Sequence, residues 1–176
     1  MPLKPLEFPT NSSEPTLQRQ VAHVERSYGI ACDVRHADRT LRVDLPRSAG
    51  GGSTGPHPGQ LLRASIGACL VMGCTQWAQR LGIALDDIQL EIAASYDERG
   101  QLGIDDSVPI GWQRLELDLV ITSAAAEADV QRVVDAARRS SPMLANLSST
   151  IEQIFRLQHI TPNPSSSTFA TKGTVP

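Results

Sequence analysis

Alternating hydrophobic and polar positions along this 176-residue chain predict a series of β-strands. The clearest alternation runs over residues 115–121, where Leu or Ile occupies every second position. Weaker alternation, or a high content of apolar residues between turn-forming residues, predicts further strands over 17–24, 30–34, 40–45, 88–92 and 150–157. The alternation indicates that each strand turns one face to a hydrophobic core.

Helical periodicity predicts a helix near residues 126–137, because its apolar residues recur on one face. These residues are Ala126, Val130, Val133, Val134 and Ala137. We expect Ser123 to cap this helix, and Arg138 and Arg139 suit its C-terminal end, where positive charge is favourable.

A second, longer helix is predicted over residues 58–81. Pro58 fits the first turn and Gly82 fits the position just past the end. At 1.5 Å per residue its length is roughly 36 Å. Apolar residues cover most of its circumference, which is typical of a helix buried on most sides. A chain of this size can hardly enclose such a helix alone, so we expect a homodimer.

The order of these elements is three strands, a long helix, two strands, a helix and a short final strand. It predicts an α+β fold with antiparallel sheets. We expect one domain over residues 17–160. Residues 1–16 are rich in proline and are predicted to form an N-terminal arm, either disordered or docked on a partner subunit, and residues 161–176 are predicted to form a flexible C-terminal tail.

Composition and charge exclude several classes of protein. The net charge of −3 and the lack of a basic run give no reason to expect nucleic acid as a partner. No apolar run reaches the ~18 residues of a membrane span, and the first residues lack the apolar core of a signal peptide. Three irregularly spaced cysteines do not form a disulfide framework, so the expected compartment is the cytoplasm.

The glycine-rich segment before the long helix has two interpretations. Five glycines within residues 50–59 precede a helix N-terminus, where phosphate could bind, but no Lys-Ser or Lys-Thr pair follows. The alternative, which we favour, is a turn that reverses the chain. The four histidines have no metal-ligand spacing, and no serine-hydrolase motif occurs, so we expect neither a metal nor a cofactor.

Cys69 and Cys74 are candidates for thiol chemistry, although a cysteine taken alone is more often a small buried side chain than a nucleophile. They are five residues apart in the helix, so they point in directions about 140° apart. A regular helix therefore excludes a disulfide between them.

One motif resembles a known family. Gly55-Pro56-His57-Pro58-Gly59-Gln60-Leu61-Leu62, followed by Ala64 and Gly67-Ala68-Cys69, is similar to the start of the central helix in the OsmC/Ohr proteins of osmotic induction and organic-hydroperoxide resistance. Residues 78–85 and 140–143 look like the same family. The resemblance covers roughly residues 17–158 and implies an intertwined homodimer. Its two long helices pack centrally between sheets built by both chains, with the sites at the subunit interface.

The resemblance also implies roles for single residues. The family's enzymes are thiol peroxidases, in which an arginine and a glutamate hold the attacking cysteine as a thiolate and a second cysteine closes a disulfide. The attacking cysteine falls on Cys69 and the arginine falls on Arg26. The glutamate falls on Gly59, with the polar Gln60 beside it, and the second cysteine falls on Ser141, so these two parts of the site are replaced.

The sequence therefore predicts an OsmC-like thiol redox protein. Its candidate reaction is the reduction of organic hydroperoxides through Cys69, with an external thiol as reductant and with Arg26 as the second catalytic residue. Gln60, Ser141 and His57 are candidate pocket residues, and Cys32 is a candidate substitute for the second cysteine. Two alternatives stay open: a non-catalytic dimer that binds an apolar small molecule at the subunit interface, and a structural dimer whose cysteines only pack.

Overall fold

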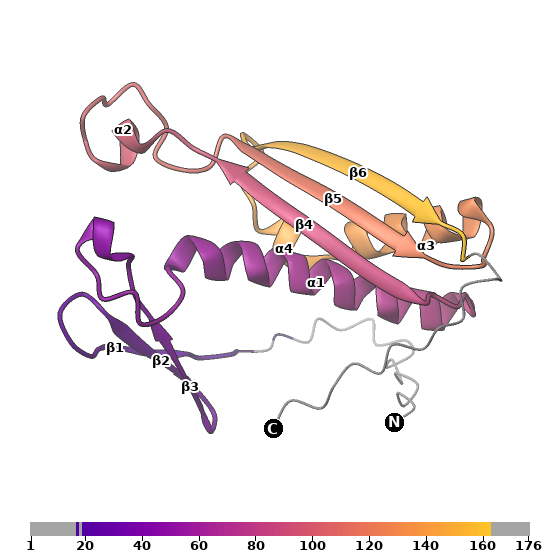
Figure 1. Cartoon of the computed structure of the whole chain (residues 1–176), viewed down its shortest axis with the longest axis horizontal. Helices are drawn as coiled ribbons and strands as arrows, with labels where there is room; N and C mark the ends of the chain where they lie inside the picture. Colours follow the sequence, from indigo (N-terminus) through magenta and orange to yellow (C-terminus); the bar gives the residue numbers. More distant parts are fainter. Residues whose placement is uncertain (1–16, 18, 163–176) are drawn as a thin grey trace. The chain divides into compact units, whose positions relative to one another are not determined.

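The computed structural model describes residue 17 and residues 19–162 (Figure 1). The chain forms two compact units, Met1–Ile66 and Gly67–Pro176, and the helix α1 (Pro58–Leu81) runs from the first into the second. The expected arm over residues 1–16 and all but the first two residues of the expected tail lie outside the described residues. No described helix is long and apolar enough to cross a membrane.

The first unit contains a three-stranded antiparallel sheet in the order β1-β2-β3. Its strands are β1 (His23–Arg26), β2 (Cys32–His36) and β3 (Arg39–Val43). The first strand begins later than the apolar pattern over 17–24 predicts. The β1–β2 turn contains Gly29 at φ 58°, a left-handed conformation that glycine adopts without steric cost.

The two faces of this sheet differ in character because opposed residues project to the same side. Val24, Val34 and Leu41 are opposed across the three strands and give one face an apolar centre. The other face carries two ion pairs, Arg35 with Glu25 and Arg42 with Asp33. The sheet is therefore amphipathic, which favours a neighbour on its apolar face.

The long helix α1 begins at Pro58 and ends at Leu81, as the sequence predicts. Gly82 follows at φ 67° and ends the helix. The opposite side from the core, which carries Ala68 and Met72, is open in the single chain, with Met72 61% exposed. Leu62, at the start of the helix, is also 47% exposed. The single chain therefore covers only part of this helix, along a buried stripe made of Ile66, Leu70, Cys74 and Ala78.

The second unit contains the sheet β4-β5-β6. Its strands are β4 (Asp87–Ser95), β5 (Arg114–Thr122) and β6 (Glu152–Ile160). β4 pairs antiparallel with β5, as predicted, but β6 pairs parallel with β5. The chain crosses from β5 to β6 through the helices α3 (Glu127–Arg139) and α4 (Pro142–Ala145), and this crossover lets β6 run in the same direction as β5.

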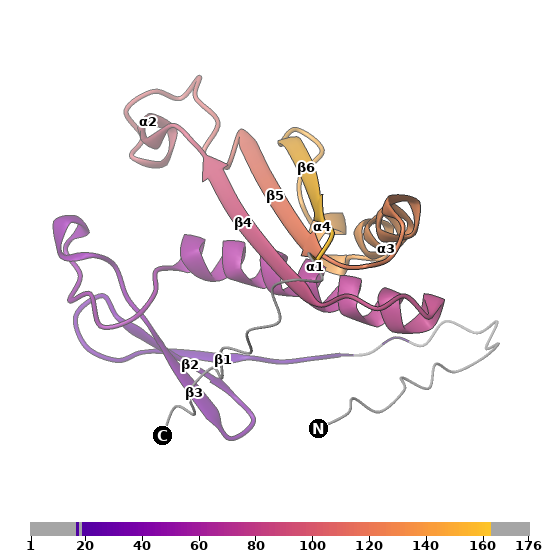
Figure 2. The same cartoon turned by 45° about the vertical axis from the view of Figure 1, so that its right-hand side comes forward.

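The helices α3 and α4 and the part of α1 in this unit lie on one face of its sheet (Figures 1 and 2). An added Cβ at Gly67 would lie 3.5 Å from Leu90 of β4, and one at Gly73 would lie 3.4 Å from the Cβ of Ala137 in α3. Small residues thus let α1 approach both the sheet and α3. The covered face contributes fully buried side chains from β5, namely Leu115, Leu117, Leu119 and Ile121.

The start of α3 differs from the prediction. Its N-cap is Ala126, which forms no side-chain capping bond. Ser123 is instead buried three residues earlier, where its hydroxyl donates to the Ala84 carbonyl at 2.6 Å and accepts from the Ala125 N–H. It therefore ties the end of β5 to the segment before β4, which the sequence pattern does not reveal.

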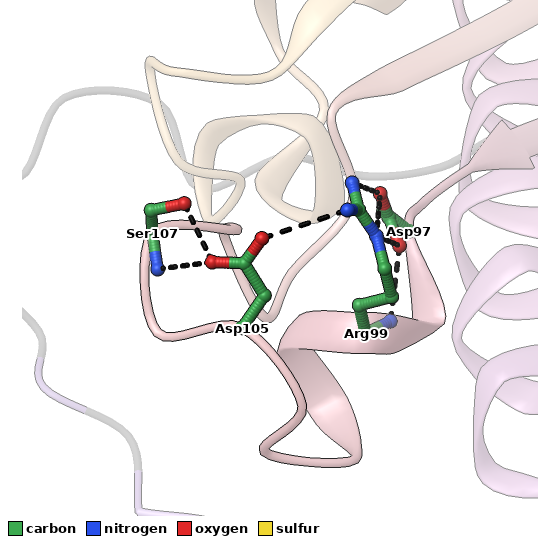
Figure 3. Close-up of polar contacts among 4 residues, drawn as sticks. All are labelled: Asp97, Arg99, Asp105 and Ser107. Atoms are coloured by element: carbon green, nitrogen blue, oxygen red, sulfur yellow. Dashed lines mark hydrogen bonds and ion pairs between the residues drawn. The ribbon is translucent and has the colours of Figure 1, made fainter.

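Residues 96–113 connect β4 to β5 and contain the short helix α2 (Glu98–Gln101). Figure 3 shows how polar contacts hold this connection together. The Arg99 guanidinium bonds Asp97 at 2.6 Å and reaches Asp105 at 3.5 Å, and Asp105 also accepts from the backbone and hydroxyl of Ser107. The contact with Arg99 lowers the pKa of Asp97. This long connection is thus ordered by its own side chains.

Candidate functional site

The half-buried Cys69 lies on α1 at the border between the buried stripe and the exposed side. Its Sγ is 3.4 Å from the hydroxyl oxygen of Ser141, which is only 4% exposed. Ser141 caps α4 by accepting a hydrogen bond from the Leu144 N–H at 3.3 Å. Its own hydrogen remains available to the sulfur, so Ser141 can donate to a Cys69 thiolate.

The neighbouring Ser140 links the same segment to α1 a second time. The indole N–H of Trp77 donates to the Ser140 hydroxyl at 2.7 Å, and that hydroxyl donates to the Ala136 carbonyl at 2.8 Å. Arg80 lies over the Trp77 ring, 4.7 Å from its centroid. Two adjacent serines therefore contact Cys69 and Trp77 of the same helix.

A hollow of about 380 Å³ opens beside Trp77. It lies between the C-terminal end of α1 and the outward side of α3, because its lining residues come from these two helices and from Ser140 just after α3. Its wall combines apolar surface with charged side chains, and the lining residues are Trp77, Leu81, Arg132, Asp135, Ala136, Arg139 and Ser140.

Cys74 is fully buried on α1. Burial raises the pKa of its thiol to about 11, because the charged thiolate is disfavoured away from water. Cys74 therefore acts as a packing residue, and the two thiols of α1 differ in exposure as their angular separation predicts.

The candidate pocket residues Gln60 and His57 meet at the start of α1. The Gln60 side-chain oxygen accepts from the His57 N–H at 3.0 Å, and the His57 Nδ1 accepts from the Gly59 N–H at 3.1 Å. A Cβ added at Gly59 would lie 3.0 Å from Cε1 of the His57 ring. Glycine at position 59 thus leaves room for the imidazole, which caps the helix where the family resemblance implies a glutamate.

The glycine-rich segment is a turn built around Asp44, and it includes the short 3-10 helix η1 (Arg47–Ala49). The buried Asp44 carboxylate accepts from the backbone of Leu45 and Gly52 and from both the backbone and hydroxyl of Thr54, at 2.7–3.0 Å. The bonds from Thr54 lower the pKa of Asp44. The turn interpretation therefore accounts for this segment, because the loop's N–H groups already bind a carboxylate.

A second hollow of about 220 Å³ lies beside this turn, lined by Asp44, Pro46, Ser53, Gly55, His57 and Gln60. Its acidic member, Asp44, already bonds the loop. Among the described residues, no three His, Cys, Asp or Glu side chains gather closely enough to hold a metal ion.

Arg26 is the last residue of β1 and is exposed. It is opposed to Cys32 of β2, and Cys32 is opposed to Val43 of β3. Both candidates therefore lie on the face of the first sheet that has the apolar centre, away from its charged pairs. Within the described part of the chain, Arg26 forms no ion pair.

The candidate residues thus form three pairs, each within one unit. These pairs are Cys69 with Ser141, His57 with Gln60, and Arg26 with Cys32.

Sequence reasoning missed Asp44, Trp77 and Ser140. Asp44 lay inside a predicted strand, but β3 ends one residue before it. An aspartate followed closely by glycines was the available signal for a turn organised by a carboxylate. The contact between Trp77 and Ser140 leaves no local signal, because the two residues are distant in the chain.

The family model for the OsmC-like protein matches residues 50–154. No curated protein matches the chain. The matched segment begins in the glycine-rich turn and includes Cys69 and Ser141, but it does not include Arg26.

Solved structures with a similar fold include an OsmC-like protein from Mycoplasma pneumoniae, with a TM-score of 0.71, 13% identity, and coverage of 81% of this chain and 98% of that one. An organic hydroperoxide resistance protein OsmC from Legionella pneumophila gives a TM-score of 0.61 at 17% identity, with coverage of 81% and 98%. The organic hydroperoxide resistance protein OhrB of Bacillus subtilis gives 0.55 at 18% identity, with coverage of 81% and 100%. At these identities the likeness is one of fold.

Proposed function

The chain belongs to the OsmC-like protein family, and from this premise we propose that it is a thiol redox protein that reduces organic hydroperoxides through Cys69. The observation that carries the proposal is the contact of the Cys69 sulfur with the hydroxyl of Ser141 at 3.4 Å. Cys69 is half-buried, whereas Cys74 is enclosed in the core with a raised pKa. Of the two thiols of α1, Cys69 is therefore the one with access to a substrate.

In the proposed first step, the Cys69 thiolate attacks the terminal oxygen of the hydroperoxide. The sulfur–oxygen bond forms while the oxygen–oxygen bond breaks, and the departing alkoxide takes up a proton to become an alcohol. Cys69 is oxidised to a sulfenic acid and the hydroperoxide is reduced. The Ser141 hydroxyl donates to the thiolate, and Arg26, assigned by the family resemblance, supplies the positive charge that stabilises it.

The second step uses an external thiol as reductant. Ser141 cannot form a disulfide, because its hydroxyl oxygen stands where the family resemblance implies a second sulfur. An external thiol condenses with the sulfenic acid, releasing water and leaving a mixed disulfide. A second equivalent of thiol then releases the Cys69 thiol and forms the external disulfide.

Cys32 is the alternative partner for oxidised Cys69, and thiol mapping distinguishes the two routes. The full chain is treated with an equimolar amount of cumene hydroperoxide in the presence of dimedone, and its cysteine peptides are identified by mass spectrometry. The external-thiol route predicts a dimedone adduct on Cys69, the signature of a persistent sulfenic acid. A peptide that links Cys32 to Cys69 would instead assign the second step to Cys32.

We also propose that the working form is a homodimer, on the strength of the open side of α1. Met72 lies on this side and Leu62 is exposed at the start of the same helix, and a second copy could cover both. The apolar face of the β1–β3 sheet, with Val24 63% and Leu41 44% exposed, offers further surface for burial between subunits. A monomeric protein in dilute solution, measured by light scattering, would contradict this part of the proposal.

The test of the reaction is turnover of cumene hydroperoxide with a dithiol as reductant. We expect the Cys69→Ser variant to lose turnover and the Cys74→Ala variant to keep it, since Cys74 is buried away from substrate. Equal turnover in the Cys69→Ser and unmodified proteins, or no turnover in any form, contradicts the proposal. In that case native mass spectrometry of the purified dimer tests the alternative, a protein that carries an apolar small molecule.

A further inference from the structure

The hollow between α1 and α3 takes no part in the proposed thiol chemistry. Its nearest link to that chemistry is Ser140, whose hydroxyl contacts Trp77, while the neighbouring Ser141 contacts Cys69. Its volume of about 380 Å³ lies within the range of roughly 300–1,000 Å³ that is typical of small-molecule sites. The chemistry of its wall therefore decides what it could bind.

One part of the wall is cationic. Arg132 and Arg139 are seven residues apart on α3, so they lie on the same side of that helix about two turns apart. Arg132 is engaged with Asp129 at 2.8 Å. Arg139 forms no ion pair within residues 19–162, so its guanidinium is available to an anion.

The wall carries two arginines and a single carboxylate, Asp135, which forms no ion pair with Arg139 among the described residues. Asp135 accepts a hydrogen bond from the Gln131 side chain at 3.0 Å, and its described contacts do not include Arg139. Arginine presents two parallel N–H groups to a carboxylate, a geometry that makes it a frequent carboxylate-binding residue. An acidic ligand is therefore favoured over a basic one.

The other part of the wall is apolar and partly aromatic. Its residues are Trp77, Leu81 and Ala136. The indole N–H is already satisfied by Ser140, and the Arg80 guanidinium lies over the ring 4.7 Å from its centroid, so a ligand would contact the part of the ring that Arg80 leaves uncovered. A flat hydrocarbon group can stack beside this ring, whereas an inorganic anion gains nothing from it.

We propose that this hollow binds a small aromatic carboxylate, with its acid group on Arg139 and its ring against Trp77. The two requirements act together, because the arginine selects the charge and the apolar wall selects the ring. The site goes beyond the proposed peroxidase function and does not depend on the thiol.

The experiment titrates the full-length protein with phenylacetate, with Trp77 fluorescence and calorimetry as the two readouts. The chain's other tryptophan, Trp112, is replaced by phenylalanine so that the emission comes from Trp77 alone. We expect saturable binding that weakens at high salt, since a charge pair at an open site is screened. Two control ligands each lack one requirement: phenylacetamide has the same shape without the charge, and inorganic phosphate has charge without the ring. Both should bind at least about tenfold more weakly than phenylacetate, the factor that corresponds to the loss of one charge-assisted hydrogen bond.

Two neighbouring arginines supply a matched pair of variants. Arg139→Gln should weaken phenylacetate binding by at least about tenfold, because it removes the carboxylate partner. Arg138→Gln is the control, since Arg138 lies over the Phe155 ring at 4.1 Å and is not part of the hollow's wall. It removes the same charge from the same end of α3 and should leave the affinity unchanged.

Each outcome decides the inference separately from the peroxidase proposal. Absence of saturable binding, equal affinity for phenylacetamide, or an equal effect of the Arg138 and Arg139 variants overturns the site. Phosphate binding as tight as that of phenylacetate overturns the role of the apolar wall. Cys69→Ser should bind phenylacetate normally, so failure of the redox function and failure of this site are distinguishable.

Discussion

Replacing Ser141 with cysteine should give Cys69 an adjacent partner for a disulfide. The present Sγ–Oγ distance is 3.4 Å. A disulfide requires about 2.05 Å, so the two atoms have to approach by roughly 1.4 Å, which side-chain rotation and a small shift of α4 can supply. We therefore expect the Ser141→Cys variant to form a bond between the Cys69 sulfur and the new thiol at position 141 on mild oxidation.

The stability change can be worked out from the chain separation. The two positions are 72 residues apart. Closing a loop of this length in the unfolded chain stabilises the folded state by about 4 kcal/mol in the chain-entropy model. Loss of the serine cap on α4 costs about 1 kcal/mol in both redox forms, so it cancels when the oxidised variant is compared with the reduced one. For a chain of this size, about 4 kcal/mol corresponds to a melting temperature roughly 8–16 °C above that of the reduced variant.

The assay is thermal unfolding of the oxidised and reduced Ser141→Cys variant, with mass spectrometry to confirm the bond. The matched control is Ser140→Cys, because the Ser140 hydroxyl contacts Trp77 instead of Cys69. We expect the control to show no reductant-dependent shift. If oxidised Ser141→Cys keeps two free thiols at these positions, or melts no higher than its reduced form, the proximity of position 141 to Cys69 is refuted.

Four further predictions concern packing and charge. Leu70→Ala should lower the free energy of unfolding by about 2–5 kcal/mol in urea titrations, because Leu70 is fully buried. Gly51→Ala should lower the free energy of unfolding by about 1–3 kcal/mol, because the added Cβ would collide with the Leu45 carbonyl. Gly111→Ala is the matched control: an added Cβ there meets nothing within 4 Å, so the urea midpoint should stay nearly unchanged. Because the folded protein lowers the pKa of Asp44, the ionised carboxylate stabilises the fold above its ordinary pKa near 3.8, and this stabilisation is lost as the pH falls through the lower folded value. Urea midpoints measured against pH should therefore fall less steeply on the acid side in Asp44→Asn than in the unmodified protein. Because burial raises the pKa of Cys74 to about 11, iodoacetamide at pH 8 should label it only after unfolding, and labelling of the native protein would contradict this.

The OsmC-like fold was predicted well where local signals agree. Helix α1 has the predicted bounds because proline begins it, glycine ends it and no proline interrupts it in between. The direction of β6 could not be predicted in the same way. Alternation identifies the buried face of a strand, but it carries no information about whether the neighbouring strand runs parallel or antiparallel.

The candidate site was predictable in part for a similar reason. The resemblance assigned Ser141 the position of a second cysteine, and the structure brings that residue against Cys69. The opposition of Arg26 and Cys32 depends on the register of a hairpin whose first strand begins later than its apolar pattern indicates. The role of Asp44 was likewise hidden, because its burial depends on backbone groups that only the folded turn brings together.

The adjacent contacts of Ser140 and Ser141 give this protein a built-in optical reporter. The Cys69 sulfur contacts Ser141, and the neighbouring Ser140 accepts the hydrogen bond of the Trp77 indole. An oxygen added to the sulfur on the side of Ser141 would displace that serine and, through the backbone, its neighbour. The emission of Trp77 should therefore change in step with the oxidation state of the thiol. In the Trp112→Phe background, a stopped-flow fluorimeter could then follow the chemistry of a single sulfur atom without any added dye.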